Sequence, residues 1–159
     1  MYHAKRTGRD RVAVYDHALG TAASRQQLAD EELRGAIEAG QIVPWYQPIL
    51  NLAADGVAAL EGFEALARWQ HPTRGLVPPD MFIPLAEEVG LIHALGDTIM
   101  LQALRQLQNW PDRRLTMAVN VSVRQLVRPG FAAEVFSRLV ELGIEPARLC
   151  LEVTESQVM

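Results

Sequence analysis

Three polar side chains fall within apolar segments that have the pattern of buried strands: Glu64, Asn120 and Glu152. Because side chains alternate between the two faces of a strand, Asn120 and Glu152 each lie on the smaller, more polar face of their segments. A carboxylate beside a buried strand loses hydration and needs a cation nearby. Carboxylate and amide oxygens suit hard cations such as Mg²⁺ and Mn²⁺. The chemistry that these residues could support is therefore metal-assisted.

Each of the three side chains also has a purely structural explanation. Asn120 could cap the turn that follows its strand, and Glu152 could pair with Arg148 or Arg68. Glu64 could also pair with Arg68, because an extended chain would place both side chains on one face. On the residue pattern alone, these structural explanations are favoured.

The elements that must position these residues alternate along the chain. Strands are predicted at 43–49, within 57–69, at 115–121 and at 149–153. Helices are predicted over 18–39, over a long region that ends before Pro111, and over 131–142. His71 falls in the Pro- and Gly-rich segment between the second strand and the long helical region, so it is predicted to be a loop residue.

This alternation favours an α/β fold, because short apolar strands separated by amphipathic helices pair in parallel through crossovers. An open sheet and a barrel both fit the pattern. In either architecture, active sites collect at the C-terminal ends of the parallel strands, where Asn120 and Glu152 both fall.

Composition excludes several classes of function. A formal net charge of -4 argues against binding to a nucleic acid polymer, which depends on a basic surface. The single cysteine, Cys150, offers neither a disulfide framework nor a cysteine-rich metal site. No apolar run approaches the roughly 18 residues that a membrane span requires. We therefore expect a cytoplasmic segment without membrane contact, and leave open whether the parent protein is membrane anchored.

A series of motifs, taken in order, closely resembles the EAL domain family over residues 28–159. The motifs are Tyr46-Gln47-Pro48-Ile49, Glu64-Ala65-Leu66-Ala67-Arg68-Trp69, His71-Pro72, Phe82-Ile83-Pro84-Leu85-Ala86-Glu87, Asn120-Val121-Ser122 and Glu152-Val153-Thr154-Glu155-Ser156. The resemblance implies the N-terminal half of a modified (β/α)8 barrel. It also implies hydrolysis of cyclic di-GMP to linear pGpG with two divalent cations, Mg²⁺ or Mn²⁺.

The resemblance also assigns a role to individual residues. The metal ligands and catalytic residues would be Glu64, Asn120 and Glu152. Arg68 would contact a phosphate of the dinucleotide, and Gln47 would lie in the ligand-binding surface. Glu155 would support the loop beside the site.

The opening residues resemble the end of a GGDEF diguanylate cyclase domain. We therefore expect a GGDEF-like tail at 1–17, a helical linker at 18–27 and the N-terminal part of an EAL domain at 28–159. The parent would be a tandem GGDEF and EAL protein, and a homodimer.

The family pattern continues beyond Met159 with an Asp-Asp-Phe-Gly-Thr-Gly segment that supplies further metal ligands. We therefore expect the intact parent to be a phosphodiesterase and this chain alone to be inactive. Two alternatives are a catalytically inactive effector domain that binds cyclic di-GMP and a structural domain that partners a cyclase.

Overall fold

The computed structural model describes residues 29–52 and 56–153. The predicted GGDEF-like tail at 1–17, the predicted linker at 18–27 and the side chain of Glu155 lie outside these residues. Within the described part of the chain, no helix combines the length and the apolar character that crossing a bilayer requires.

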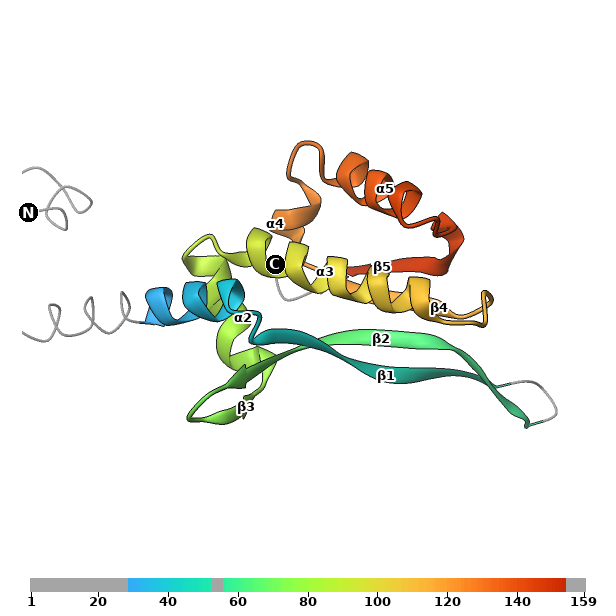
Figure 1. The fold of residues 1–159 in the computed structure, drawn as a ribbon, viewed down its shortest axis with the longest axis horizontal. Coiled ribbons are helices and arrows are strands. Elements are labelled where there is room, and N and C mark those ends of the chain that lie inside the picture. The colour runs from blue at the N-terminus through green and yellow to red at the C-terminus, as the bar shows by residue number, and fades with distance from the viewer. Residues whose placement is uncertain (1–28, 53–55, 154–159) are drawn as a thin grey trace, which may run out of the picture.

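A five-stranded sheet forms the centre of the fold, in the order β1-β2-β4-β5 with β3 paired to β2 (Figure 1). Its strands are β1 (Ile42–Leu52), β2 (Ala58–His71), β3 (Gly75–Val77), β4 (Thr116–Val121) and β5 (Leu149–Val153). β2, β4 and β5 run parallel to one another. β1 and β3 pair with β2 in antiparallel orientation. The predicted α/β fold with parallel pairing is confirmed, and the antiparallel pairing of β1 with β2 was not predicted.

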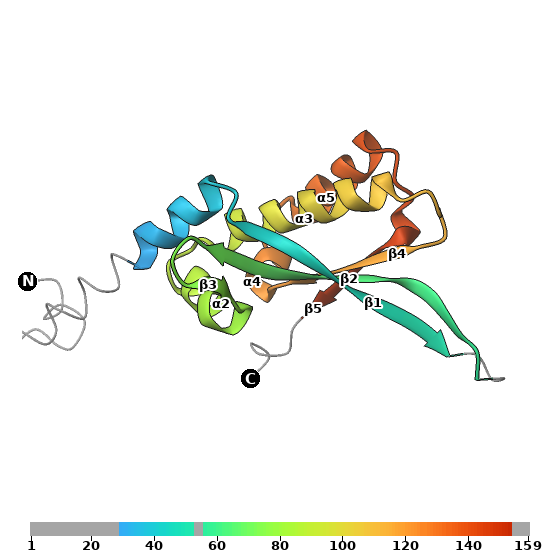
Figure 2. The same cartoon turned by 60° about the horizontal axis from the view of Figure 1, so that its bottom comes forward.

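Helices connect the parallel strands. A helix spans residues 29–38, and the others are α2 (Pro79–Glu88), α3 (Ile92–Asn109), α4 (Val123–Leu126), α5 (Phe131–Glu141) and the short 3-10 turn Pro146–Arg148. α3 packs against β1, β2 and β4, and α5 lies beside β5 on the same side of the sheet (Figures 1 and 2). Both helices arise from apolar residues at three- and four-residue spacing, which gives each one an apolar stripe to bury.

The sheet has one face that packs against helices. On β4, the side chains that face the helices are fully buried: Met117, Val119 and Val121. On β1 and β2, the rings of Tyr46 and Phe63 lie 6.4 and 4.8 Å from that of Trp110, at the end of α3. Burial raises the pKa of the Tyr46 phenol above its ordinary value.

The opposite face carries the polar residues, and we call it the open face. It is defined by Gln47, Glu64, Asn120 and Glu152, which alternate along their strands with residues that face the helices. Gln47 and Glu152 are exposed there. The hydrophobic core therefore lies between the helices and one face of the sheet, while the polar side chains lie on the other face.

His71 is the buried last residue of β2, so its predicted place in a loop is wrong. Its Nε2 lies 2.7 Å from Glu32 Oε1, in the helix 29–38, and its Nδ1 accepts hydrogen bonds from the backbone N–H groups of Thr73 and Arg74 at 3.1 Å. Arg74 Nη2 also donates to Glu32, at 2.8 Å. The hydrogen bond from His71 has the largest effect on the pKa of Glu32 and lowers it, and the charge of Arg74 lowers it further. This cluster fixes the first described helix to the β2–β3 turn.

Candidate active site

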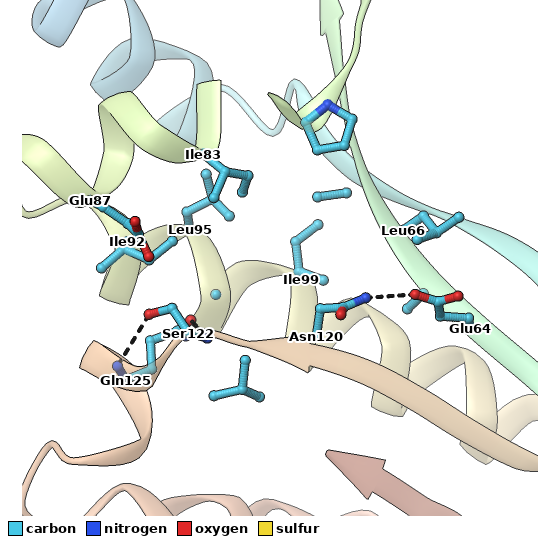
Figure 3. A pocket seen from close by; sticks show the side chains of 15 residues that line it. Glu64, Leu66, Ile83, Glu87, Ile92, Leu95, Ile99, Asn120, Ser122 and Gln125 are labelled. Atoms are coloured by element: carbon cyan, nitrogen blue, oxygen red, sulfur yellow. Dashed lines mark hydrogen bonds between the residues drawn. The ribbon is translucent and has the colours of Figure 1, made fainter. Parts of the chain in front are cut away.

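Glu64 and Asn120 meet across two neighbouring parallel strands. Asn120 Nδ2 donates a hydrogen bond to Glu64 Oε1 at 2.7 Å (Figure 3). The register of β2 and β4 pairs Glu64 with Ala118, so Asn120 lies two residues further toward the carboxyl end of the sheet. The bond fixes the direction of the carboxylate and leaves the amide oxygen of Asn120 as an acceptor.

Glu152 lies beside Asn120 on the next strand. The register of β4 and β5 pairs the two residues directly, which puts their side chains on the same face about 4.8 Å apart along the sheet. Glu152 is exposed on the open face. The fold thus gathers Glu64, Asn120 and Glu152 on one face of three adjacent strands, with Asn120 and Glu152 near the carboxyl ends of β4 and β5 and Glu64 in the middle of β2.

The structural explanation for Asn120 as a cap does not hold. Ser122 is the N-cap of α4, and its Oγ accepts a hydrogen bond from Gln125 N at 3.3 Å. Gln125 Oε1 in turn accepts from Ser122 N at 3.1 Å, which completes a capping box. Ser122 therefore takes the capping role, and Asn120 is left to bond Glu64.

Arg148 donates its hydrogen bonds to backbone carbonyl groups and not to a carboxylate. Its side chain is buried and donates from Nε to Leu115 O at 3.0 Å and from Nη2 to Leu107 O at 3.4 Å. No ion pair joins Glu152 to Arg148 or Arg68 among the residues that the structure describes. The carboxylate of Glu152 thus has none of the cationic partners that its sequence position suggested.

Gln47 and Arg68 border the three residues on the open face. Gln47 is the direct partner of Glu64 in the register of β1 and β2. Arg68 donates from Nη1 to Ala67 O at 2.8 Å, and its Cζ lies 6.0 Å from the centre of the Trp45 ring. Among the described residues, Glu64 and Arg68 form no ion pair, so the guanidinium keeps N–H donors that are not used by a carboxylate.

A cavity of about 370 Å³ opens next to this set, between the strands β2 and β4 and the helices α2 and α3 (Figure 3). Glu64 and Asn120 form one side of it. Its walls are mainly apolar and include Leu66, Ile83, Ile92, Leu95 and Ile99. The cavity gives the carboxylate and the amide an apolar neighbourhood in which electrostatic contacts are stronger than in water.

Gln125 lines the cavity and its side-chain amide lies close to Gly96 of α3. A Cβ atom at Gly96 would overlap the side-chain amide of Gln125, and would lie 3.0 Å from its Oε1. Sequence reasoning missed Gln125 and Trp45. The spacing of Ser122 and Gln125, typical of a capping box, was the available signal for the first. An aromatic residue two positions before Gln47 was the signal for the second.

The donor set fits a hard divalent cation. Within 29–52 and 56–153, no cluster of three or more His, Cys, Asp or Glu side chains is arranged around a metal position. The set on the open face has two carboxylates and one amide, whose oxygens are the ligands that Mg²⁺ and Mn²⁺ prefer. With this set the protein could hold part of a coordination shell.

The comparison with known families shows to which family the chain belongs. The profile of the EAL domain matches residues 30–159. The chain belongs to the EAL domain family. The resemblance that the motifs predicted is therefore confirmed for the EAL part of the chain, while the GGDEF-like tail stays a prediction.

Relatives of this EAL domain include two named signalling proteins. The chain is 40% identical, over all of its length, to the bifunctional diguanylate cyclase/cyclic di-GMP phosphodiesterase MucR of Pseudomonas aeruginosa, of which it covers 23%. It is 38% identical over 98% of its length to the cyclic di-GMP phosphodiesterase PdeR of Escherichia coli, of which it covers 23%. The chain thus spans about a fifth of the length of the curated relatives that it matches.

A solved structure shares the fold of this EAL domain. It is the PaMucR phosphodiesterase in complex with c-di-GMP, with a TM-score of 0.75 and 40% identity. The match covers 83% of this chain and 53% of that one. The sheet and helices described above therefore correspond to about half of that phosphodiesterase.

Proposed function

We propose that the chain forms the first half of a modified (β/α)8 barrel that hydrolyses cyclic di-GMP to linear pGpG. The names of MucR and PdeR, and the dinucleotide complex of PaMucR, support this substrate. The parallel strands β2, β4 and β5, with helices between them, support the barrel half.

The observation that carries the proposal is the meeting of Glu64 and Asn120 at 2.7 Å, with Glu152 beside Asn120 in the register. Two of these three side chains are carboxylates, and no cationic side chain pairs with either of them among the described residues. Ligation of divalent cations explains why they lie together.

In this mechanism, Glu64, Asn120 and Glu152 are metal ligands for Mg²⁺ or Mn²⁺. Two such cations, when bound, would polarise the phosphodiester and lower the pKa of an attacking water. The amide of Asn120 holds Glu64 in a fixed direction through its Nδ2, and can ligate through its oxygen. No protein nucleophile is required.

Two further residues on the open face bind the substrate. Arg68 donates to a phosphate oxygen, for which its planar set of N–H groups is suited. Gln47, exposed opposite Glu64, contacts the dinucleotide with its amide. Both side chains orient the phosphodiester relative to the metal ligands.

The regions around the site complete the proposal. Residues 1–17 would end a GGDEF-like domain, residues 18–27 would link it to the EAL domain at 28–159, and Glu155 would support the loop after β5. The intact protein would be a cytoplasmic homodimer.

The test is hydrolysis of cyclic di-GMP by the intact protein in the presence of Mg²⁺ or Mn²⁺, followed by chromatography of pGpG. Replacing Glu64 by Gln removes a ligand charge, and we expect turnover to fall about 100- to 1,000-fold, the usual cost of losing a preorganised electrostatic group. Asn120→Ala should weaken Mn²⁺ binding, measured by calorimetry, about 10- to 100-fold. The control is Glu61→Gln, the same Glu-to-Gln change at an exposed position of β2. It should leave both the turnover and the affinity for Mn²⁺ unchanged.

Full activity of the Glu64→Gln protein would contradict the proposed metal site. Tight binding of cyclic di-GMP by the unsubstituted protein without turnover would favour the inactive effector domain instead. Absence of any binding would favour a structural domain.

A further inference from the structure

A tryptophan on the edge strand is turned toward the open face. Trp45 is 50% exposed, although it is flanked in β1 by the buried Pro44 and by Tyr46, which packs against Trp110. Because neighbours in a strand point to opposite faces, the packing of Tyr46 sends the indole ring of Trp45 to the open face. The exposed face of the indole ring is therefore available to neighbouring side chains on the open face.

The register puts this ring next to Arg68. Trp45 pairs with Leu66, so Arg68, two residues further along β2, is its diagonal neighbour on the same face. Diagonal neighbours in an antiparallel pair are within reach of aromatic and long side chains. The guanidinium carbon lies 6.0 Å from the ring centre, a distance at which the ring attracts a cation.

Arg68 has few other restraints. Its hydrogen bond to Ala67 O uses Nη1, and within the described part of the chain no carboxylate forms an ion pair with it. A free arginine side chain loses much rotamer freedom when it binds a ligand, which weakens the binding. A weakly hydrated guanidinium held over an aromatic ring has already lost part of that freedom.

We propose that Trp45 is a positioning residue for Arg68: its ring holds the guanidinium on the open face, which also carries Glu64 and Asn120, before the phosphodiester arrives. This role rests on the proposed phosphodiesterase function, in which Arg68 binds a phosphate. Trp45 itself does not have to touch the substrate. Removing the ring then weakens substrate binding through Arg68 and leaves the chemical step, which depends on the metal ligands, unchanged.

The experiment measures KM and kcat for cyclic di-GMP hydrolysis by the intact protein at saturating Mn²⁺. Trp45→Leu keeps apolar bulk but loses the ring, and should raise KM about 2- to 5-fold, the size of an exposed cation–π contact, at constant kcat. Trp45→Phe keeps a ring and should restore most of the affinity. Leu52→Ala, at another exposed position of β1, is the matched control and should change neither constant.

A double-mutant cycle with Arg68→Ala separates positioning from direct contact. If Trp45 acts through Arg68, adding Trp45→Leu to Arg68→Ala should leave KM unchanged. An equal loss in both backgrounds, or an unchanged KM for Trp45→Leu alone, would overturn the inference. A wild-type protein that does not hydrolyse cyclic di-GMP would instead refute the proposed function, so the two failures are distinguishable.

Discussion

Gly62 offers a sharp test of how closely β2 and β4 must approach. It lies in β2, two residues before Glu64, directly opposite Thr116 of β4. A Cβ atom at this position would overlap the hydroxyl and the carbonyl oxygen of Thr116, and would lie 2.9 Å from its carbonyl carbon, where ordinary contact begins at 3.4 Å. Gly62→Ala therefore forces the two strands apart by at least about half an ångström.

The loss of stability caused by Gly62→Ala depends on which atoms of Thr116 must move. Overpacking of a well-packed site costs about 1–3 kcal/mol. Since the overlapping atoms include backbone and not only a flexible side chain, we expect the free energy of unfolding to fall by about 3 kcal/mol, the upper end of that range. The same separation would lengthen the bond between Glu64 and Asn120, so metal-dependent hydrolysis should fall with stability.

Urea unfolding followed by circular dichroism measures this change. The matched control is Gly35→Ala, an exposed position in the helix 29–38 with no atom within 4 Å of the added Cβ. The control should gain up to about 1 kcal/mol, because alanine favours the helix more than glycine does. If Gly62→Ala unfolds at the same urea concentration as the unsubstituted protein, the inferred strand contact is wrong.

Two predictions concern the pH dependence of stability. The hydrogen bond from His71 lowers the pKa of Glu32 below its ordinary 4.5, so this contact stabilises the fold above pH 4.5 and is lost as the pH falls through the lower, folded-state pKa. When the midpoint of unfolding is measured as a function of pH, Glu32→Gln should reduce the loss of stability below pH 4.5. An equally large loss in the variant would contradict this. Burial raises the pKa of Tyr46 above 10.0, so stability falls as the pH rises beyond 10.0, where the unfolded chain ionises first. Tyr46→Phe should remove that alkaline decline, and an equally steep decline in the variant would count against burial as its cause.

Strands and helices with strong periodicity could be predicted from the sequence. The segment 149–153 was predicted as a strand and is β5, and the prediction at 115–121 differs from β4 by one residue. The prediction at 43–49 was made despite Pro44 and Pro48 and was too short, since β1 spans Ile42–Leu52. β1 is an edge strand, in which proline loses no necessary ladder hydrogen bond.

The candidate site was predictable in its residue types and not in its contacts. Alternation predicts the face on which Asn120 lies, but the bond to Glu64 depends on the register between strands 56 residues apart in sequence. The alternative in which Asn120 caps the following turn does not hold, because Ser122, two residues later, is the N-cap of α4.

The close approach of α3 to Gln125 ties together two positions far apart in the sequence. A side chain at position 96 would occupy the space that the amide of Gln125 now fills, so the two positions compete for that space. A larger residue at position 96 would push the end of this flexible side chain aside, and with it the Oε1 that accepts a hydrogen bond from Ser122 N in the capping box of α4. The residue at position 96 of α3 therefore helps to determine whether Gln125 can complete the N-terminal cap of a helix that begins 27 residues later in the sequence.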